Sequence, residues 1–283
     1  MSVNQRIESF EREGLRFDVV DTGPIEGELV VLLHGWPETA RSWAKVARLL
    51  NEEGYRTLVP NQRGYSPGAR PRAIRAYRID ALVEDVVALI ERAGGGPVHL
   101  AGHDWGAAVA WSLASSRPDL VRTLTTLSVP HPSAFIRAMA KGDQLKKSYY
   151  IGLFQIPFLP EWLLSNRPTV FRRMLRGSGM THEEIDHVFR DLVDSGALPT
   201  TLNWYRAMRY PSALARTSKI KRPTTFIWSD KDVALSRDGA ELTADYVDAP
   251  YRLVVMEGAT HWLPTQHPEA VAETMLETFE RAS

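Results

Sequence analysis

Short, continuous apolar runs alternate with helix-length amphipathic segments over most of the 283-residue chain. Uninterrupted apolar strands are typical of a parallel sheet that helices cover on both faces, so this pattern strongly constrains the fold and predicts a largely parallel α/β sheet. The segment "RIDALVEDVVALIERAG" predicts a helix that stops at glycine, with an apolar stripe at Leu82, Val86, Leu89 and Ile90. The expected strands include those that begin at Leu15, Glu28, Arg56, Pro97, Thr123, Thr224 and Tyr251.

From about His131 to Lys219 the alternation stops, and helical segments such as "THEEIDHVFRDLVDSG" and "TLNWYRAMRY" follow without strands between them. The chain is long enough for one large domain that carries an insertion. We therefore predict a core formed by residues 1–131 and 219–283. A helical cap, residues 132–218, is inserted between the sixth and seventh strands of that core.

Charge and composition exclude several classes of partner. Lysine and arginine total 34, aspartate and glutamate also total 34, and the formal net charge is zero, so neither nucleic acid nor an anionic membrane is indicated. The most apolar stretch, residues 149–164, is broken by two prolines and is too short to span a bilayer. The first residues contain no apolar segment typical of a secretory signal, and we expect a cytoplasmic protein.

No cofactor or metal is implied. The chain has no cysteine, which excludes disulfides and thiolate-bound metals, and no cluster of ligand residues has a recognisable spacing. The glycine-rich stretch "RAGGGPVHL" leads into a strand, whereas a dinucleotide fingerprint leads from a strand into a helix.

Two short motifs compete for the role of nucleophile. "GHDWG" (102–106) has the outline of a G-x-S-x-G nucleophile elbow with Asp104 in place of serine, while "GYSPG" (64–68) is a literal match through Ser66. An elbow requires a strand that turns sharply into a helix, with glycines that relieve the crowding. Asp104 lies between such a strand and a good helix, but Ser66 is followed by a proline and a basic loop. We predict Asp104 as the nucleophile.

A base and an acid follow in the order that such a site requires, which is nucleophile, acid, base. His261 in "GATHWLP" follows the last predicted strand, and "WSDKDVAL" supplies Asp230 and Asp232 after the strand before it. We predict His261 as the base and Asp232 as the acid, with Asp230 shaping the turn. His103, next to the elbow residue, is expected to pack or to form hydrogen bonds.

"HGWPET" (34–39) occupies the loop that supplies an oxyanion donor in such cores, directly after the strand "ELVVLL". The backbone N–H groups of Trp36 and Trp105 are the predicted oxyanion hole. Each such donor contributes roughly 3–4 kcal/mol to the stabilisation of an oxyanion. Pro37 is a candidate for a cis peptide bond.

An aspartate at the elbow indicates attack at a saturated carbon. A carboxylate that attacked a carbonyl would form a costly anhydride, whereas attack on an sp³ carbon gives an ordinary alkyl ester. Epoxides and alkyl halides are the main electrophiles of this kind. His261, held by Asp232, would then activate a water that attacks the carboxyl carbon of Asp104. A halide leaves as a stable anion, but an epoxide oxygen needs an acid such as tyrosine.

The chain resembles the epoxide hydrolases of the α/β-hydrolase fold along nearly its whole length. "HGWP", "GHDWG", "WSDKD" and "GATHW" all look like motifs of that family. Two cap segments, "YYIGLFQIP" and "LNWYR", look like its ring-opening motifs and select Tyr150 and Tyr205. The resemblance implies that both phenols point at the epoxide oxygen. Two positions depart from it, because Phe158 stands where glycine is common and Asn61 where aspartate is expected.

The expected substrate is a small apolar epoxide, with water as the second reactant. The aromatic content of the cap predicts an apolar pocket over the nucleophile. The expected substrate-binding residues are Trp36, Trp105, Phe154 and Trp262.

Other readings stay open at this point. A haloalkane dehalogenase would use the same aspartate, and "HGW" has tryptophan where many such enzymes have asparagine. A serine-type acyl hydrolase through Ser66 and a catalytically silent binding protein on this fold are more remote. The sequence leaves the oligomeric state open between monomer and homodimer.

Overall fold

The structure is a computed structural model that describes residues 5–141, 143–212 and 218–281. Its eight-stranded sheet has the order β1-β2-β4-β3-β5-β6-β7-β8. The first two strands join it by antiparallel pairing and the other six run parallel to one another. The strands are β1 (Ser9–Arg12), β2 (Leu15–Thr22), β3 (Leu29–Leu33), β4 (Arg56–Pro60), β5 (Val98–His103), β6 (Val121–Leu127), β7 (Thr224–Ser229) and β8 (Tyr251–Met256).

The seven expected strands are all present, and the prediction of a largely parallel α/β fold is confirmed. Strands β3, β4, β5 and β7 are almost entirely buried, as their continuous apolar runs predict. β1 was not expected, because its four residues, "SFER", are too few and too polar to show a strand pattern. It forms an edge of the sheet by pairing with β2.

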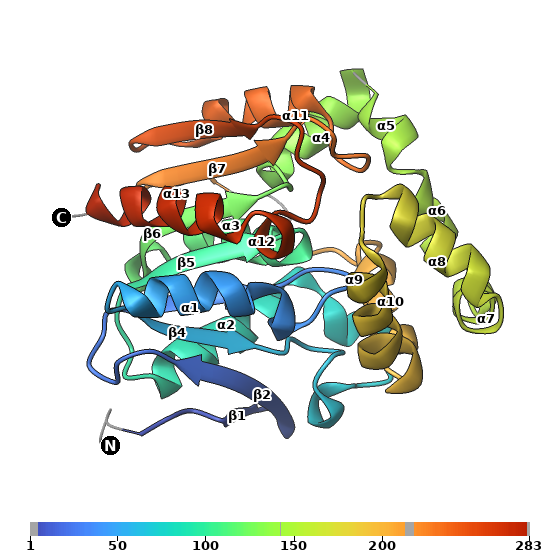
Figure 1. Cartoon of the computed structure of the whole chain (residues 1–283), viewed down its shortest axis with the longest axis horizontal. Coiled ribbons are helices and arrows are strands. Elements are labelled where there is room, and N and C mark those ends of the chain that lie inside the picture. The colour runs from blue at the N-terminus through green and yellow to red at the C-terminus, as the bar shows by residue number, and fades with distance from the viewer. Residues whose placement is uncertain (1–4, 142, 213–217, 282–283) are drawn as a thin grey trace.

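Helices cover both faces of the sheet, with α1 and α13 side by side in front of it in Figure 1 and α2 and α3 behind it. The four residues of the predicted stripe on α2 are buried, which confirms that helix. The core helices are α1 (Ala44–Glu52), α2 (Ile79–Arg92), α3 (Trp105–Ser116), α11 (Arg237–Leu242), α12 (Leu263–Gln266) and α13 (Pro268–Glu280). Short helical turns are η1 (Ala40–Trp43), η2 (Pro67–Ala69), η3 (Ile74–Tyr77), η4 (Pro118–Leu120) and η7 (Thr243–Tyr246).

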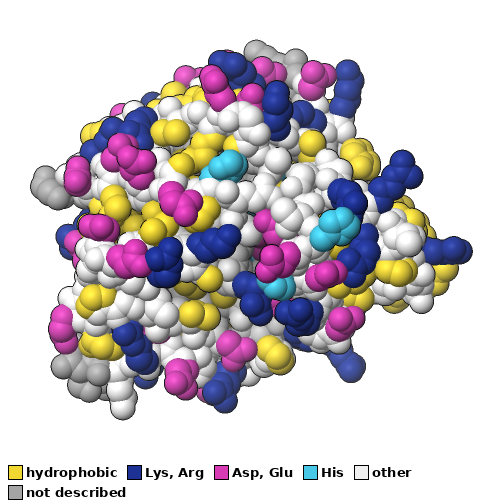
Figure 2. All heavy atoms as spheres, in the orientation of Figure 1, with side chains coloured by type: hydrophobic (Ala, Val, Ile, Leu, Met, Phe, Trp, Pro, Cys, Tyr) yellow, Lys and Arg dark blue, Asp and Glu magenta, His cyan; other side chains and the backbone are white. Residues whose placement is uncertain are grey.

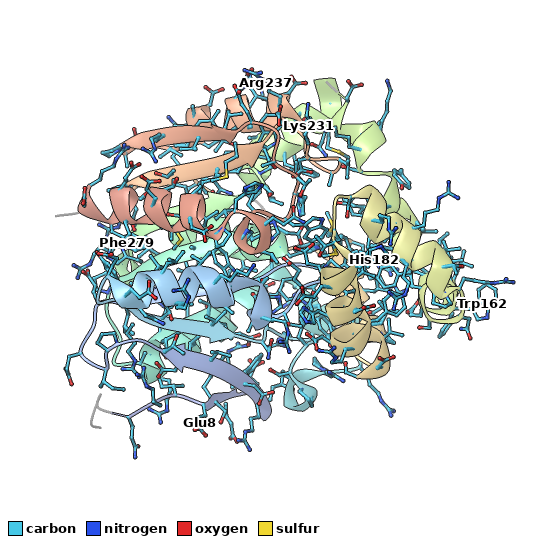
Figure 3. All side chains as sticks on the ribbon, in the orientation of Figure 1. Glu8, Trp162, His182, Lys231, Arg237 and Phe279 are labelled. Carbon is cyan, nitrogen blue, oxygen red and sulfur yellow. The ribbon has the colours of Figure 1, made fainter. Side chains whose placement is uncertain are left out.

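A helical insertion separates β6 from β7, at the place where the sequence predicts it. Figure 1 shows α6 to α10 grouped at one end of the sheet, and Figure 3 places Trp162 of α7 at the outer tip of this group. The first inserted helix packs against α11 and η7 of the core, so the predicted limits of the cap at 132 and 218 stay a prediction. The inserted elements are α4 (Pro132–Lys141), α5 (Gln144–Lys147), α6 (Tyr149–Phe154), α7 (Leu159–Asn166), α8 (Pro168–Gly177), α9 (His182–Val188), η5 (Phe189–Asp194) and α10 (Leu198–Ala207).

Acidic and basic side chains are interspersed over the face of the molecule shown in Figure 2, as the balanced composition predicts. Of the helices formed by the described residues, none combines the length and the apolar character needed to cross a membrane.

Candidate active site

Asp104 lies in the sharp turn between β5 and α3, with φ 52° and ψ −121°. A non-glycine residue in this left-handed region costs about 1–3 kcal/mol, so packing must hold it there. Glycines allow that packing: a Cβ at Gly102 would overlap the backbone of Gly106, and a Cβ at Gly106 would overlap the carbonyl of Leu33. A Cβ at Gly35 would overlap the Asp104 side chain itself. The turn therefore has the geometry predicted for a nucleophile elbow.

The Asp104 carboxylate accepts a backbone hydrogen bond and lies at the start of a helix. The N–H of Trp36 donates a hydrogen bond of 2.7 Å to its Oδ1, and the Trp36–Pro37 peptide bond is cis. Trp105 is the first residue of α3, so its N–H belongs to the positive end of a twelve-residue helix. One oxygen of the carboxylate thus binds the first of the two predicted oxyanion donors, and the role of the Trp105 N–H stays a prediction.

His261 and Asp232 lie beside the nucleophile. His261 Nδ1 is 2.7 Å from Asp232 Oδ2, and its Nε2 is 3.6 Å from Asp104 Oδ2. The N–H groups of Ala234 and Leu235 donate to Asp232 Oδ1, at 2.7 and 3.0 Å, and so orient the acid. The three predicted triad side chains are therefore brought together in a buried site.

The electrostatics of this group favour a charged histidine. Burial opposes the imidazolium, but the carboxylates of Asp232 and Asp104 outweigh it and raise the pKa of His261 to about 10. Burial likewise raises the pKa of the Asp232 carboxyl, but His261 and the two backbone N–H groups outweigh it and lower that pKa below its ordinary value. Asp232 is thus an anion and His261 a cation while Asp104 carries its charge.

The competing residues of the sequence analysis serve structural roles. Asp230 Oδ1 accepts a hydrogen bond of 2.7 Å from the N–H of Gly258, which joins the loop after β7 to the loop after β8. Ser66 is fully buried; its hydroxyl donates to the carbonyl of Asn61 at 2.8 Å and accepts from the N–H of Asp18 at 2.9 Å. The Ser66 hydroxyl is therefore hydrogen-bonded to backbone groups both as a donor and as an acceptor.

Tyr150 of α6 and Tyr205 of α10 meet above the elbow, with ring centroids 6.0 Å apart in an edge-to-face arrangement. Phe154 packs against both rings, and Trp36 and Trp105 pack edge-on against Tyr205. Burial and then the Asp104 charge raise the pKa of both phenols far above the ordinary tyrosine value. Both phenols therefore keep their protons and are hydrogen-bond donors at neutral pH.

Two cavities share Asp104, Tyr150 and Tyr205 in their walls. One has a volume of about 300 Å³ and a mainly apolar wall that includes Val129, Phe135, Ile136, Met208 and Leu235. The other has a volume of about 350 Å³, and its wall includes Trp36, Phe154, Trp262, Lys147, Arg173 and His261. All four predicted substrate-binding aromatics line one of these cavities, with Trp105 in the first and the other three in the second.

His103 forms a hydrogen bond, as expected: its Nε2 donates to the carbonyl of His261 at 2.9 Å. Sequence reasoning missed three other polar side chains around the triad, of which buried Glu38 lies 3.5 Å from His103 Nδ1. Gln144 and Lys147 of α5 bind the loop that carries Asp232. The motif "HGWPET" contains Glu38, but nothing in the letters around Gln144 or Lys147 indicates their partners, which lie about 90 residues away. Among the described residues no cluster of His, Asp and Glu is arranged to hold a metal ion.

Comparison with known proteins agrees with this fold. The model of the α/β hydrolase fold family matches residues 28–268. The protein named AB hydrolase superfamily protein YfhM of Bacillus subtilis is 34% identical over 93% of this chain and 94% of its own length. Epoxide hydrolase A of Mycobacterium tuberculosis is 31% identical over 94% of this chain and 95% of its own length. The crystal structure of Epoxide Hydrolase A from Mycobacterium thermoresistibile superposes with a TM-score of 0.82 and 31% identity, over 95% of this chain and 96% of that one. The chain belongs to the epoxide hydrolase family of the α/β-hydrolase fold.

Proposed function

We propose that this protein is an epoxide hydrolase that converts an epoxide and water into a vicinal diol through an alkyl ester on Asp104. The observation that carries the proposal is that a carboxylate and two protonated phenols lie together in the walls of the same two cavities. A halide would need no acid, so the paired tyrosines favour an epoxide.

In the first step, an Asp104 carboxylate oxygen attacks one carbon of the epoxide ring and the carbon–oxygen bond on that carbon breaks. The ring oxygen takes a proton from Tyr150 or Tyr205 while the other phenol donates a hydrogen bond to it. The Trp36 N–H, which already binds Oδ1, leaves Oδ2 as the attacking atom. Because the phenols are neutral, no separate proton donor is required.

In the second step, His261 takes a proton from water and the resulting hydroxide attacks the carboxyl carbon of the ester. The carbonyl oxygen becomes an oxyanion that the N–H groups of Trp36 and Trp105 stabilise. The intermediate then releases the diol and restores the Asp104 carboxylate. The leaving alkoxide takes the hydroxyl proton of the intermediate, and His261 keeps the proton that it took from water, which restores the imidazolium of the free enzyme and closes the cycle.

Ester formation itself prepares His261 for this role. In the free enzyme its pKa of about 10 makes it a cation, which is no base. The ester removes the negative charge of Asp104, and with it one of the interactions that hold the proton on His261. The pKa of His261 therefore falls, and its proton passes to the phenolate formed in the first step. The neutral imidazole that remains is the base that the second step needs.

The cavities predict the kind of epoxide. The mainly apolar cavity fits an alkyl or aryl substituent, and the second cavity receives a substituent on the other side of the ring. We therefore propose small apolar epoxides as substrates, including those with a substituent on each carbon.

An intact-mass experiment tests the proposal. The variant His261→Gln should form the ester without hydrolysing it, so it is incubated separately with an aryl epoxide and with a primary bromoalkane. A mass gain equal to the whole epoxide, mapped to the Asp104 peptide, is the expected result. The variant His261→Gln with Asp104→Asn is the matched control and should gain no mass.

Other outcomes are equally decisive. An adduct from the bromoalkane alone would show a dehalogenase and leave the tyrosines as packing residues. An epoxide adduct on a residue other than Asp104 would overturn the mechanism.

A further inference from the structure

The loop that carries the triad acid is bound by side chains of the insertion. This loop, residues 230–236, follows β7, and Figure 3 labels Lys231 on it. The short helix α5 precedes α6, the helix that carries Tyr150. Two side chains of α5, Gln144 and Lys147, make hydrogen bonds to the loop.

Lys147 binds the two ends of the segment that orients the acid. Its ammonium group donates to the carbonyl of Asp232 at 2.6 Å and to the carbonyl of Leu235 at 2.9 Å. The N–H of Leu235 in turn donates to Asp232 Oδ1. Lys147 thus holds closed the same turn whose N–H groups align the carboxylate.

Gln144 binds the middle of that turn, and it is fully buried. Its amide N–H₂ donates to the carbonyl of Ala234 at 2.8 Å, and its amide oxygen accepts from the N–H of Ser236 at 2.8 Å. A second N–H₂ contact, of 2.9 Å, goes to Ser148, next to the start of α6. Four hydrogen bonds from two side chains therefore join the insertion to the acid loop.

We propose that Gln144 and Lys147 are positioning residues that fix the place of the Asp232 loop relative to α6, the helix that carries Tyr150. The proposal rests on the function proposed above. Tyr150 acts when the ring opens, and Asp232 acts through His261 when the ester is hydrolysed. Because residues 144–150 are contiguous, one segment sets the place of a group used in each half of the reaction.

This role differs from plain structural support in the step that it affects. Ester formation needs Asp104 and the phenols, whereas hydrolysis also needs His261 to be aligned by Asp232. Loss of the Lys147 contacts should therefore slow hydrolysis more than ester formation. A variant that is merely less stable would contain less active enzyme, which leaves the ratio of the two rate constants unchanged.

The test compares Lys147→Met with Lys146→Met in the whole 283-residue chain, with an aryl epoxide as the probe. Lys146 is the matched control, because it is 85% exposed on the same helix and pairs only with Asp143 among the described residues. Rapid mixing followed by quench and intact mass gives the rate constants for ester formation and for hydrolysis. We expect hydrolysis in Lys147→Met to fall by about 10- to 100-fold relative to ester formation, with the ester accumulating during turnover. Lys147→Arg, which keeps the donors, should recover most of the loss.

An equal ratio of rate constants in Lys147→Met and Lys146→Met would overturn the proposal, and so would equal behaviour of Lys147→Met and Lys147→Arg. If the wild-type enzyme forms no ester with any epoxide, the proposed function fails instead.

A measurement without substrate then tests the positioning role of Lys147 independently of the proposed reaction. In a protein with ¹⁵N-labelled histidine, the His261 Nδ1–H bound to Asp232 should give a strongly downfield proton signal that is lost in His261→Gln. We expect Lys146→Met to keep this signal and Lys147→Met to shift or broaden it. An unchanged signal in Lys147→Met would contradict the proposal.

Discussion

The two halves of the candidate site are held in place by different means. In the core half, Asp104, Asp232 and His261 follow the ends of strands β5, β7 and β8, and backbone N–H groups bind the carboxylates directly. In the cap half, Tyr150 and Tyr205 come from separate helices and are held by aromatic rings packed around them. The order of the strands in the sheet therefore places the residues of the core half. The packing of side chains places the residues of the cap half.

This difference indicates which residues of the site can be substituted and how much activity each substitution removes. Glycine contacts around the elbow leave no room for a Cβ, so the core half tolerates little change in shape. The cap half surrounds the phenols with rings that can be replaced by others of similar volume. We expect changes in the core half to stop the chemistry and changes in the cap half to alter which electrophile reacts.

The largest expected effect is that of Asp104→Ala. Removal of the nucleophile should lower epoxide turnover by about 10⁴-fold or more, because no ester can form. Steady-state diol formation measures this loss, with circular dichroism as the check on folding. Ser66→Ala is the control in the core, and its folded enzyme should keep wild-type turnover per molecule. Loss of turnover in folded Ser66→Ala would instead favour a serine-type hydrolase with Ser66 as the nucleophile.

The cap half gives the next largest effect. Tyr150→Phe combined with Tyr205→Phe removes both phenols and keeps both rings, so the packing survives while ring opening loses its acid. We expect a loss of about 10²- to 10⁴-fold in ester formation from an epoxide. Single-turnover mass measurements give this rate. Substantial epoxide opening in the double variant would defeat the two-tyrosine mechanism.

The sequence predicted the core half more completely than the cap half. An elbow, an acid and a base each follow a strand, and parallel strands bring such residues to one edge of the sheet, so topology alone places Asp104, Asp232 and His261. Nothing comparable places Tyr150 and Tyr205, which were selected through the family resemblance. The hydrogen bonds of Lys147 to the acid loop were not predicted, because contacts between side chains and distant backbone carbonyls leave no periodic pattern.

A smaller effect concerns stability against pH. The folded-state pKa of His261, about 10, lies above the unfolded value of about 6.5, so its stabilising contribution is complete below pH 6.5. The contribution is lost as the pH rises from about 6.5 to about 10. The free energy of unfolding in urea should therefore fall over this window by more than about 1 kcal/mol relative to His261→Gln.

The double tyrosine variant tests whether the cap half contributes to this dependence of stability on pH. The raised pKa values of Tyr150 and Tyr205 keep both phenols neutral across that window, so Tyr150→Phe with Tyr205→Phe should show the same slope as wild type. A wild-type slope equal to that of His261→Gln would show that the charged pair of His261 and Asp232 does not form.

The smallest expected effect separates the two neighbouring aspartates of the acid loop. Asp230→Ala removes a carboxylate whose side chain is one-third exposed and accepts one hydrogen bond, from the N–H of Gly258. The cost should be about 1 kcal/mol in the free energy of unfolding, with kcat within about twofold of wild type. Asp232→Ala should instead slow ester hydrolysis by about 10²-fold or more, because His261 loses the group that aligns it. The two variants differ by two positions in the chain, so equal losses of hydrolysis rate would mean that the loop as a whole, rather than the Asp232 carboxylate, supports the base.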